Sequence, residues 1–332
     1  ILNHDLSSEL AGDMVHFLSR CQHPTGGFGG GPWQMAHLAT TYAAINAVTT
    51  IGTEEAFDMV SNKRATAETV EGLVDRESMV DFLWRMRQAD GTFLMHEGGE
   101  SDVRGCYSAA VIAVILNIQD PALFEGTAEY IARCQTYEGG FAGVPGAEAH
   151  GGYTFCSLSC LVLLGRADLC DIDGLLRWAS HRQMCLEGGF SGRCNKLVDG
   201  CYSFWVGAIF PILDSLFRHW SVRGVDKRAL PDVPYNLFHE DALTEYILGC
   251  CQGFGGGLLD KPGKPADMYH TCYTLSGLAI STASDWVPEE DEETQDLVLD
   301  QLNPLLGVSA AKAVSVLEYF QAKTKIIRTK PV

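Results

Sequence analysis

Apolar residues along this chain follow a helical spacing that is interrupted by a glutamine and a cluster of glycines. The interruption occurs five times, beginning at Gln22, Gln88, Gln135, Gln183 and Gln252. The segment before an interruption is amphipathic, as in residues 128–135, whereas the segment after it is apolar on nearly every side, as in residues 107–116. These patterns predict an outer helix, a glycine turn and a buried inner helix in each repeat.

The repeat predicts an all-α architecture, because a helix pair recurring at intervals of roughly 45 to 70 residues is typical of stacked helical units. Stacked helix pairs form either an open solenoid or a closed α/α toroid, a barrel whose inner helices line a central cavity. Periodicity alone does not choose between the two.

A polar residue stands three positions before a tyrosine at the predicted start of four inner helices. The pairs are Arg104/Tyr107, His150/Tyr153, Asp199/Tyr202 and His270/Tyr273, and His37 precedes Tyr42 at a looser spacing. Parallel inner helices would bring these polar residues to one mouth of the cavity, where helix N-termini also favour anions. Each could simply cap its helix, but four residues of mixed chemistry at one position favour a binding site.

Residues 192–205 combine metal-binding side chains with positive charge. Asp199 and Cys201, together with His270, supply three protein ligands, which suits a catalytic zinc ion with an open fourth position. Asp199 and Cys201 are two positions apart, so they can share an ion only if the chain enters a helix there. Arg193 and Lys196 suit a phosphate or diphosphate. The segment therefore suggests group transfer from a diphosphate ester.

Composition narrows the class of protein. The 332 residues, 46% of them apolar, can bury one large core or two smaller ones. The net charge of −18 argues against a nucleic-acid partner, and no apolar run approaches the ~18 residues that span a bilayer. The twelve cysteines indicate reduced thiols rather than disulfides. We expect a soluble, cytoplasmic protein without stable membrane insertion, with solvated charged segments at residues 289–293 and from Lys323 onward.

Ordered motifs along essentially the whole chain resemble the β subunits of protein farnesyltransferases. The matching segments are residues 26–42, 100–104, 124–129, 148–156, 192–205, 258–264 and 269–277. The resemblance implies a single α/α-barrel domain over residues 1–332 and an obligate heterodimer with a helical-repeat α subunit. It also implies transfer of farnesyl from farnesyl diphosphate to the cysteine of C-terminal Cys-a-a-X sequences, in clients such as small GTPases.

The same resemblance implies roles for individual residues. Zinc would be bound by Asp199, Cys201 and His270, and Mg²⁺ by Asp260. These zinc ligands form the catalytic set with Arg193, Lys196 and Tyr202. Farnesyl diphosphate would contact His150, Arg193, Lys196, Tyr202, Arg104, Tyr107, Tyr153, Trp205 and Tyr273, the last limiting lipid length. The Cys-a-a-X peptide would contact His37, Glu100, Arg104 and Tyr269.

Two departures from the family pattern concern the first repeat. A polar stretch at about residues 61–75 lengthens it, and we interpret this stretch as a surface loop. The resemblance also implies a tryptophan-bearing helix before the first glycine turn, and no tryptophan precedes Gln22 in this sequence.

Three other interpretations compete with a prenyltransferase. A structural zinc site could use Cys185, Cys194 and Cys201, but these lack a repeated Cys-x-x-Cys pair. A non-catalytic helical scaffold leaves Arg193, Lys196 and Asp260 without a purpose. A terpene cyclase needs an Asp-rich motif in the cavity, and the acidic run here lies in a polar loop.

Overall fold

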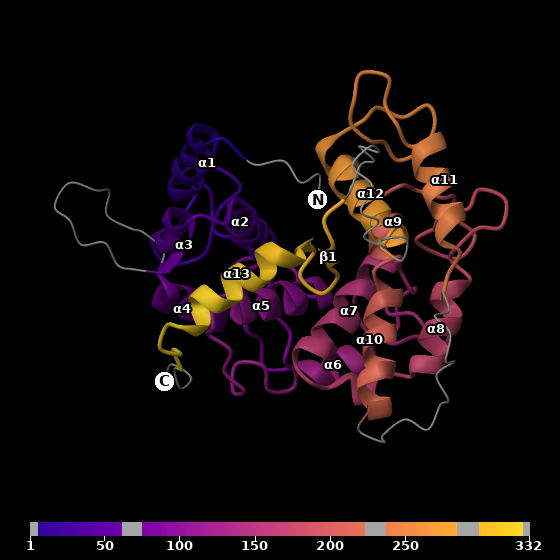
Figure 1. The fold of residues 1–332 in the computed structure, drawn as a ribbon. Coiled ribbons are helices and arrows are strands. Elements are labelled where there is room, and N and C mark those ends of the chain that lie inside the picture. Colours follow the sequence, from indigo (N-terminus) through magenta and orange to yellow (C-terminus); the bar gives the residue numbers. More distant parts are fainter. Residues whose placement is uncertain (1–5, 62–74, 223–236, 284–298, 328–332) are drawn as a thin grey trace. The chain divides into compact units, whose positions relative to one another are not determined.

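The computed structural model describes residues 6–61, 75–222, 237–283 and 299–327 (Figure 1). The chain divides into two compact units. Unit 1 holds residues 135–158 and 170–307, and unit 2 holds the described residues up to 134, residues 159–169 and those from 308 onward. Residues 62–74, which make up most of the predicted surface loop, and the acidic run at 289–293 lie outside the described residues.

Unit 2 is built from short helices around one apolar helix. Its elements are α1 (Ser8–Arg20), α2 (Leu38–Ile51), α3 (Glu54–Ser61), α4 (Arg76–Met86), α5 (Val103–Ile115), α6 (Thr127–Arg133), η1 (Ala167–Leu169), β2 (Val308–Ser309) and α13 (Ala310–Gln321). Helix α5 is buried along almost its whole length and packs against α2. The continuous apolar run after the second glycine turn therefore forms the predicted inner helix.

Unit 1 carries the other helices. They are α7 (Gly151–Leu163), of which residues up to 158 belong here, α8 (Ile172–Ser180), α9 (Tyr202–Trp205), α10 (Ile209–Val222), α11 (Glu240–Cys250) and α12 (Met268–Ser281), followed by β1 (Leu302–Asn303). Helices α9 and α12 pack against each other. The predicted, mostly helical class is confirmed.

The five predicted glycine turns all form, and each closes with a single antiparallel bridge. The bridged pairs are Gln22 with Phe28, Arg87 with Phe93, Gln135 with Phe141, Gln183 with Phe190, and Gln252 with Leu258. The four phenylalanines are fully buried, so each anchors its turn in the core. In three repeats the amide of the anchor donates to a threonine hydroxyl of the following helix at 2.9 Å, as Phe141 does to Thr154. The turn and the helix after it are thus one hydrogen-bonded unit.

Of the four polar residues that stand three positions before a tyrosine, two lie at the start of an inner helix and two do not. The ninth residue after each anchor accepts a backbone N–H at the helix start, and these residues are His37, Asp102, His150, Asp199 and Asp267. Arg104 and His270 instead lie inside the first turns of α5 and α12. The spacing to tyrosine therefore marks the helix start at His150 and Asp199 and fails at Arg104 and His270, because the tyrosines occupy different depths in different helices.

Two general properties of the described ranges bear on the class of protein. No helix there combines the length and apolar character needed to cross a membrane. All twelve cysteines fall within these ranges and carry free thiols.

The contact between α9 and α12 depends on a glycine. A Cβ on Gly277 would lie 2.2 Å from Cβ of Ser203 and 2.6 Å from its carbonyl carbon. We predict that Gly277→Ala lowers the free energy of unfolding by about 2 kcal/mol, because the helices must separate to admit the methyl group. Gly249, exposed in α11 with no atom near its would-be Cβ, is the matched control. Gly249→Ala should raise stability by about 0.5–1 kcal/mol. Equal midpoints of chemical denaturation for the two variants would contradict this account.

Candidate active site

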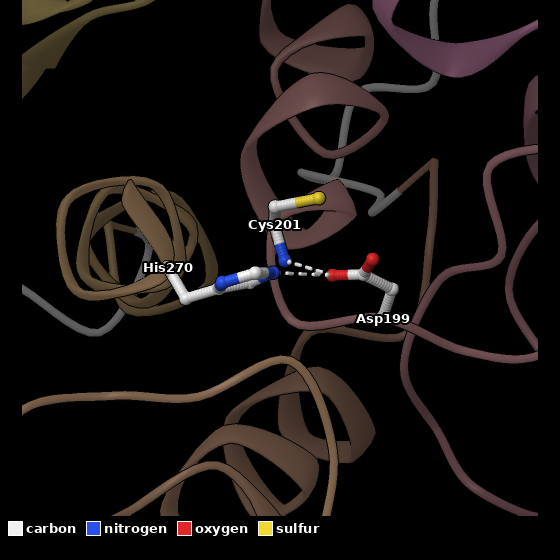
Figure 2. A group of neighbouring side chains, drawn as sticks. All are labelled: Asp199, Cys201 and His270. Atoms are coloured by element: carbon white, nitrogen blue, oxygen red, sulfur yellow. Dashed lines mark hydrogen bonds and ion pairs between the residues drawn. The ribbon is translucent and has the colours of Figure 1, made fainter. Parts of the chain in front are cut away.

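Three side chains suited to binding a metal ion converge where α9 and α12 begin (Figure 2). One ligand atom from each of Asp199, Cys201 and His270 lies within 4.8 Å of the others, and among the described residues no other group of three or more such side chains was found. His270 Nε2 is 3.4 Å from Asp199 Oδ1. In Figure 2 the His270 ring nitrogen and the Cys201 backbone amide both approach the same oxygen of the Asp199 carboxylate.

The local backbone explains how two residues only two positions apart reach the same point. Helix α9 begins at Tyr202, and the N–H of Cys201 donates to Asp199 Oδ1 at 2.9 Å. The residue between them must be glycine, because a Cβ on Gly200 would lie 2.7 Å from both the Leu259 carbonyl oxygen and Thr274 Oγ1. The chain therefore enters a helix at this point, as the sequence predicts.

A carboxylate outside the predicted set orients His270. Asp267 Oδ2 lies 2.6 Å from His270 Nδ1, and its Oδ1 accepts the His270 backbone N–H at 2.8 Å. The backbone and side-chain hydrogen bonds from His270 lower the pKa of Asp267. Since an ionised carboxylate only accepts hydrogen bonds, Nδ1 carries a proton, and Nε2 is the ring nitrogen left to bind a metal ion beside Asp199 and Cys201. Sequence reasoning missed Asp267, although it occupies the same capping position as Asp199.

The electrostatics of the group favour a bound cation. Cys201 is only 4% exposed, and burial, followed by the charge of Asp199, raises the pKa of its thiol. A thiolate and a carboxylate this close in a buried place are costly unless a cation compensates them. Sulfur, imidazole nitrogen and carboxylate oxygen are together a donor set that fits a tetrahedral metal ion.

A second polar group in unit 1 contains the predicted diphosphate contacts. His150 Nε2 and the Tyr202 hydroxyl are 2.9 Å apart, and His150 Nδ1 accepts the Gly152 N–H. A neutral His150 with Nδ1 as acceptor carries its proton on Nε2, so the Tyr202 oxygen accepts it and the phenolic proton stays available for another acceptor. Burial raises the pKa of Tyr202, which keeps this proton in place.

The cationic residues near Tyr202 in the sequence, Arg193 and Lys196, are more exposed to solvent. Arg193 is partly exposed and lies 3.4 Å from Glu148 Oε2. Lys196 is exposed and follows Asn195, whose φ of 58° turns the backbone into the left-handed region. A Cβ on Gly192 would lie 1.9 Å from Cζ of Tyr202, so the loop passes directly over that ring.

The backbone of Asp260, the predicted magnesium residue, is hydrogen-bonded to the segment that carries Asp199 and Cys201. Its carbonyl accepts the Gly200 N–H at 2.7 Å and the Tyr246 hydroxyl at 3.3 Å. Its carboxylate pairs with Lys261. A magnesium ion there would have to compete with that lysine.

Aromatic side chains gather beside the metal group. The Trp205 and Tyr273 rings are 4.3 Å apart between centroids, and Tyr269 and Tyr273 are 4.9 Å apart. Tyr153 packs on His150 at 5.0 Å. These residues give unit 1 an apolar surface next to its polar site.

The remaining predicted residues cluster in unit 2. Arg104 forms ion pairs with Asp102 at 2.6 Å and Glu100 at 3.6 Å. Burial, followed by the nearby charges of His96 and Arg104, lowers the pKa of His37, and the charge of Glu100 opposes this shift. Tyr107 faces Tyr42, with their hydroxyls 3.4 Å apart. The predicted zinc and diphosphate residues thus lie in unit 1, and the predicted contacts to the peptide carboxylate lie in unit 2.

Comparison with known proteins identifies similar chains. Residues 1–308 match the family model described as the prenyltransferase alpha-alpha toroid domain, which confirms the predicted toroid fold. Protein farnesyltransferase subunit beta of Pisum sativum is 38% identical, over 96% of this chain and 86% of the relative. The protein of the same name from Arabidopsis thaliana is also 38% identical, over 97% of this chain and 73% of the relative.

A solved structure supports the same fold. The Candida albicans protein geranylgeranyltransferase-I complexed with GGPP has a TM-score of 0.68 and 20% sequence identity, over 93% of this chain and 84% of that chain. At this identity the likeness concerns the fold alone.

The contact between Asp267 and His270 predicts an effect on metal binding. Asp267→Asn can still accept the His270 backbone N–H, but its amide group cannot replace an ionised carboxylate at Nδ1. We predict that metal affinity falls about 10- to 100-fold, as is typical when the partner of a metal-binding histidine is lost. Competition with a chromophoric chelator, using Zn²⁺, measures it. Asp75→Asn changes an equivalent carboxylate cap, that of α4, and should leave the affinity unchanged; a similar loss in both variants would argue against a specific role for Asp267.

Proposed function

This chain belongs to the prenyltransferase α-α toroid family, among the protein farnesyltransferase β subunits, and on that premise we propose that it transfers farnesyl from farnesyl diphosphate to the cysteine thiol of C-terminal Cys-a-a-X sequences. One observation carries the proposal beyond family membership. The metal-binding group of Asp199, Cys201 and His270 and the polar pair of His150 and Tyr202 lie in one unit. A thiol-activating site and an anion-binding site are both required for this reaction.

Zinc is the metal that we propose for Asp199, Cys201 and His270. Mixed sulfur, nitrogen and oxygen donors suit zinc, and three protein ligands leave one position for a substrate. When bound, zinc would supply a positive charge that keeps the thiol of the peptide cysteine, ordinarily with a pKa near 8.5, as a nucleophilic thiolate at neutral pH. The chain itself contributes the buried thiol of Cys201 and the imidazole of His270 oriented by Asp267.

The leaving diphosphate needs donors that are in place before its negative charge grows. We propose Arg193, Lys196 and Tyr202 as these donors, with His150 acting through the proton that it donates to Tyr202, and Mg²⁺ at Asp260. The Tyr202 hydroxyl can serve as a donor, because its oxygen accepts the Nε2–H of His150 and its own proton is left for the diphosphate. Arg193 offers a planar fork for two phosphate oxygens, and Lys196 a point charge.

The farnesyl chain needs an apolar surface, and we propose that aromatic side chains supply it. The candidates are Tyr153, Trp205 and Tyr273 in unit 1 and Tyr107 in unit 2, with Arg104 as a further contact. Tyr273 is the one we propose to limit lipid length. For the peptide we propose contacts with Tyr269 in unit 1 and with His37, Glu100 and Arg104 in unit 2, where Arg104 can bind a carboxylate.

The proposed partners follow from the family. Relatives named as β subunits support a heterodimer with an α subunit, and small GTPases that end in Cys-a-a-X are the proposed clients. The net charge of −18 disfavours a nucleic-acid partner. Free thiols on twelve cysteines suit the reducing cytoplasm, where we propose that the enzyme acts.

A transfer assay tests the proposed function. The chain is co-expressed with a farnesyltransferase α subunit and offered a Cys-a-a-X peptide with farnesyl or geranylgeranyl diphosphate. We expect faster farnesyl transfer, lost in Cys201→Ala and retained in Cys185→Ala, which changes an exposed cysteine of the same unit. Preferential geranylgeranyl transfer would reassign the lipid, and full activity of Cys201→Ala would refute the proposed metal site.

Arg193→Ala tests the anion-binding half of the site. Loss of one donor that stabilises transition-state charge typically costs about 3 kcal/mol, or roughly 100-fold in rate. Turnover should fall by this amount while the thermal midpoint stays unchanged, because Arg193 is partly exposed. Arg218→Ala removes an exposed arginine that pairs with Asp214 on α10 and serves as the control. Parental turnover in Arg193→Ala would exclude the proposed role.

A further inference from the structure

Residues 192–197 form a loop, called here the cationic loop, that carries the two positive charges proposed for the diphosphate. An antiparallel bridge between Ser191 and Val198 closes it. Near its middle, Asn195 has a φ of 58°, so the chain turns back there in the left-handed region. The bridge fixes the two ends of the loop. Contacts elsewhere must fix its middle if the cations are to be in place before an anion arrives.

Two contacts with the preceding repeat involve the start of the cationic loop. The Gly192 carbonyl accepts the N–H of Gly151, the first residue of α7, at 2.8 Å. Arg193 Nη1 lies 3.4 Å from Glu148 Oε2, and these side chains are 40% and 50% exposed, so solvent weakens the ion pair. A diphosphate bound to Arg193 would also compete with Glu148 for the guanidinium. This ion pair is therefore poorly suited to fix the loop in the bound state.

Cys194 makes a third contact that does not use either cation. Its Sγ lies 2.9 Å from Oε2 of Glu138 in the third glycine turn, 56 positions earlier in the sequence. Cys194 stands between Arg193 and Lys196. Its hydrogen bond can persist when an anion binds the two cations, because the thiol itself is not needed by the anion.

The thiol of Cys194 is the donor in this hydrogen bond. An ionised carboxylate only accepts, so the proton comes from sulfur. The hydrogen bond to Glu138, followed by burial, raises the pKa of the Cys194 thiol, which keeps that proton in place at neutral pH. A hydrogen bond to an ionised group is about twice as strong as one between neutral groups.

The turn that presents Glu138 is itself tightly hydrogen-bonded. The Glu138 N–H donates to Thr136 Oγ1 at 3.2 Å, and that hydroxyl donates to the Gly140 carbonyl at 3.0 Å. The next residue, Phe141, is the fully buried anchor of the turn. The carboxylate therefore projects from a backbone that is fixed in the core of unit 1.

We infer that Glu138 and Cys194 are positioning residues for the diphosphate site, whose hydrogen bond holds the cationic loop where Arg193 and Lys196 meet the anion. The inference rests on the proposed function in taking these two cations as diphosphate contacts. Neither Glu138 nor Cys194 needs to touch the substrate. Both act through the position of the loop.

Equilibrium binding of farnesyl diphosphate tests the inference without turnover. The chain is co-purified with an α subunit and titrated in the absence of peptide. Cys194→Ala removes the donor and Glu138→Ala the acceptor, so each should weaken binding about 10-fold, the effect expected for one hydrogen bond to a charged group. Cys194→Ser keeps a donor and should restore most of the affinity. Parental affinity in both alanine variants would overturn the inference.

Glu138→Gln separates position from charge. The amide keeps an oxygen that accepts the thiol proton, but the substitution removes a negative charge near the two cations. We expect an affinity close to the parental value. If Glu138 acted only through its charge, Glu138→Ala and Glu138→Gln would both bind the diphosphate more tightly, and that result would overturn the inference.

A background without the two cations shows whether the effect passes through them. In the Arg193→Ala, Lys196→Ala double variant, adding Cys194→Ala should change the affinity little, because the loop then has no cation to position. A further loss of about 10-fold in this background would show that Cys194 acts by another route, and would overturn the inference.

Glu187 and Cys185 provide matched controls. In the fourth glycine turn Glu187 stands three residues before the anchor Phe190, as Glu138 does before Phe141, and it is exposed. Cys185 is an exposed cysteine of the same turn. Glu187→Ala and Cys185→Ala should both bind farnesyl diphosphate with parental affinity, and a 10-fold loss in either would overturn the specific role of the Glu138–Cys194 pair.

The double variant also separates the inference from the proposed function. If Arg193→Ala, Lys196→Ala binds farnesyl diphosphate with parental affinity, the proposed diphosphate contacts are wrong and the inference falls with them. If this variant binds weakly while Cys194→Ala and Glu138→Ala bind normally, the inference alone is wrong.

Discussion

The first backbone N–H groups of a helix have no partner within the helix, and the site of this protein depends on how each repeat satisfies them. A side chain at the ninth position after the bridged anchor of every glycine turn accepts one of these groups. This requirement is purely structural, since a helix start without a capping partner loses about 1 kcal/mol of stability. The requirement nevertheless places a polar side chain at the same point of every repeat.

The residue at this position differs between repeats, and its side chain gives the position a different chemical role in each. Asp199 accepts the Cys201 N–H just before α9 with one oxygen and lies in the metal-binding group, whereas Asp267 caps α12 and orients His270. His150 accepts a helix N–H at Nδ1, which leaves Nε2 for Tyr202. In each case the bond that stabilises the helix start also sets the orientation or protonation of a side chain at the proposed site.

Much of this arrangement could be predicted from the sequence, because local patterns of residues indicate turns and buried helices. The glycine turns, the buried α5 and the convergence of Asp199, Cys201 and His270 all follow from residue types and spacings. The starts of α5 and α12 did not follow, since the spacing to tyrosine marks His150 and Asp199 but not Asp102 and Asp267, whereas the distance from the anchor of the glycine turn marks all four. Asp267 was missed for the same reason.

Other features lie beyond a single sequence because they depend on contacts between distant segments. The need for glycine at 200 comes from the carbonyl of Leu259 and the hydroxyl of Thr274. The close approach at Gly277 comes from Ser203 on another helix. The link from Trp205 to Tyr269 joins α9 to α12. None of these partners is near in sequence, so only the folded structure reveals them.

The central claim is that Asp199, Cys201 and His270 hold a zinc ion with one position open for the substrate thiol. X-ray absorption at the zinc edge, on the chain co-purified with an α subunit, tests it most directly. The account predicts one sulfur ligand without peptide and two when a Cys-a-a-X peptide is bound. A sulfur count that stays at one on peptide binding, or a zinc ion with four protein ligands throughout, would contradict it.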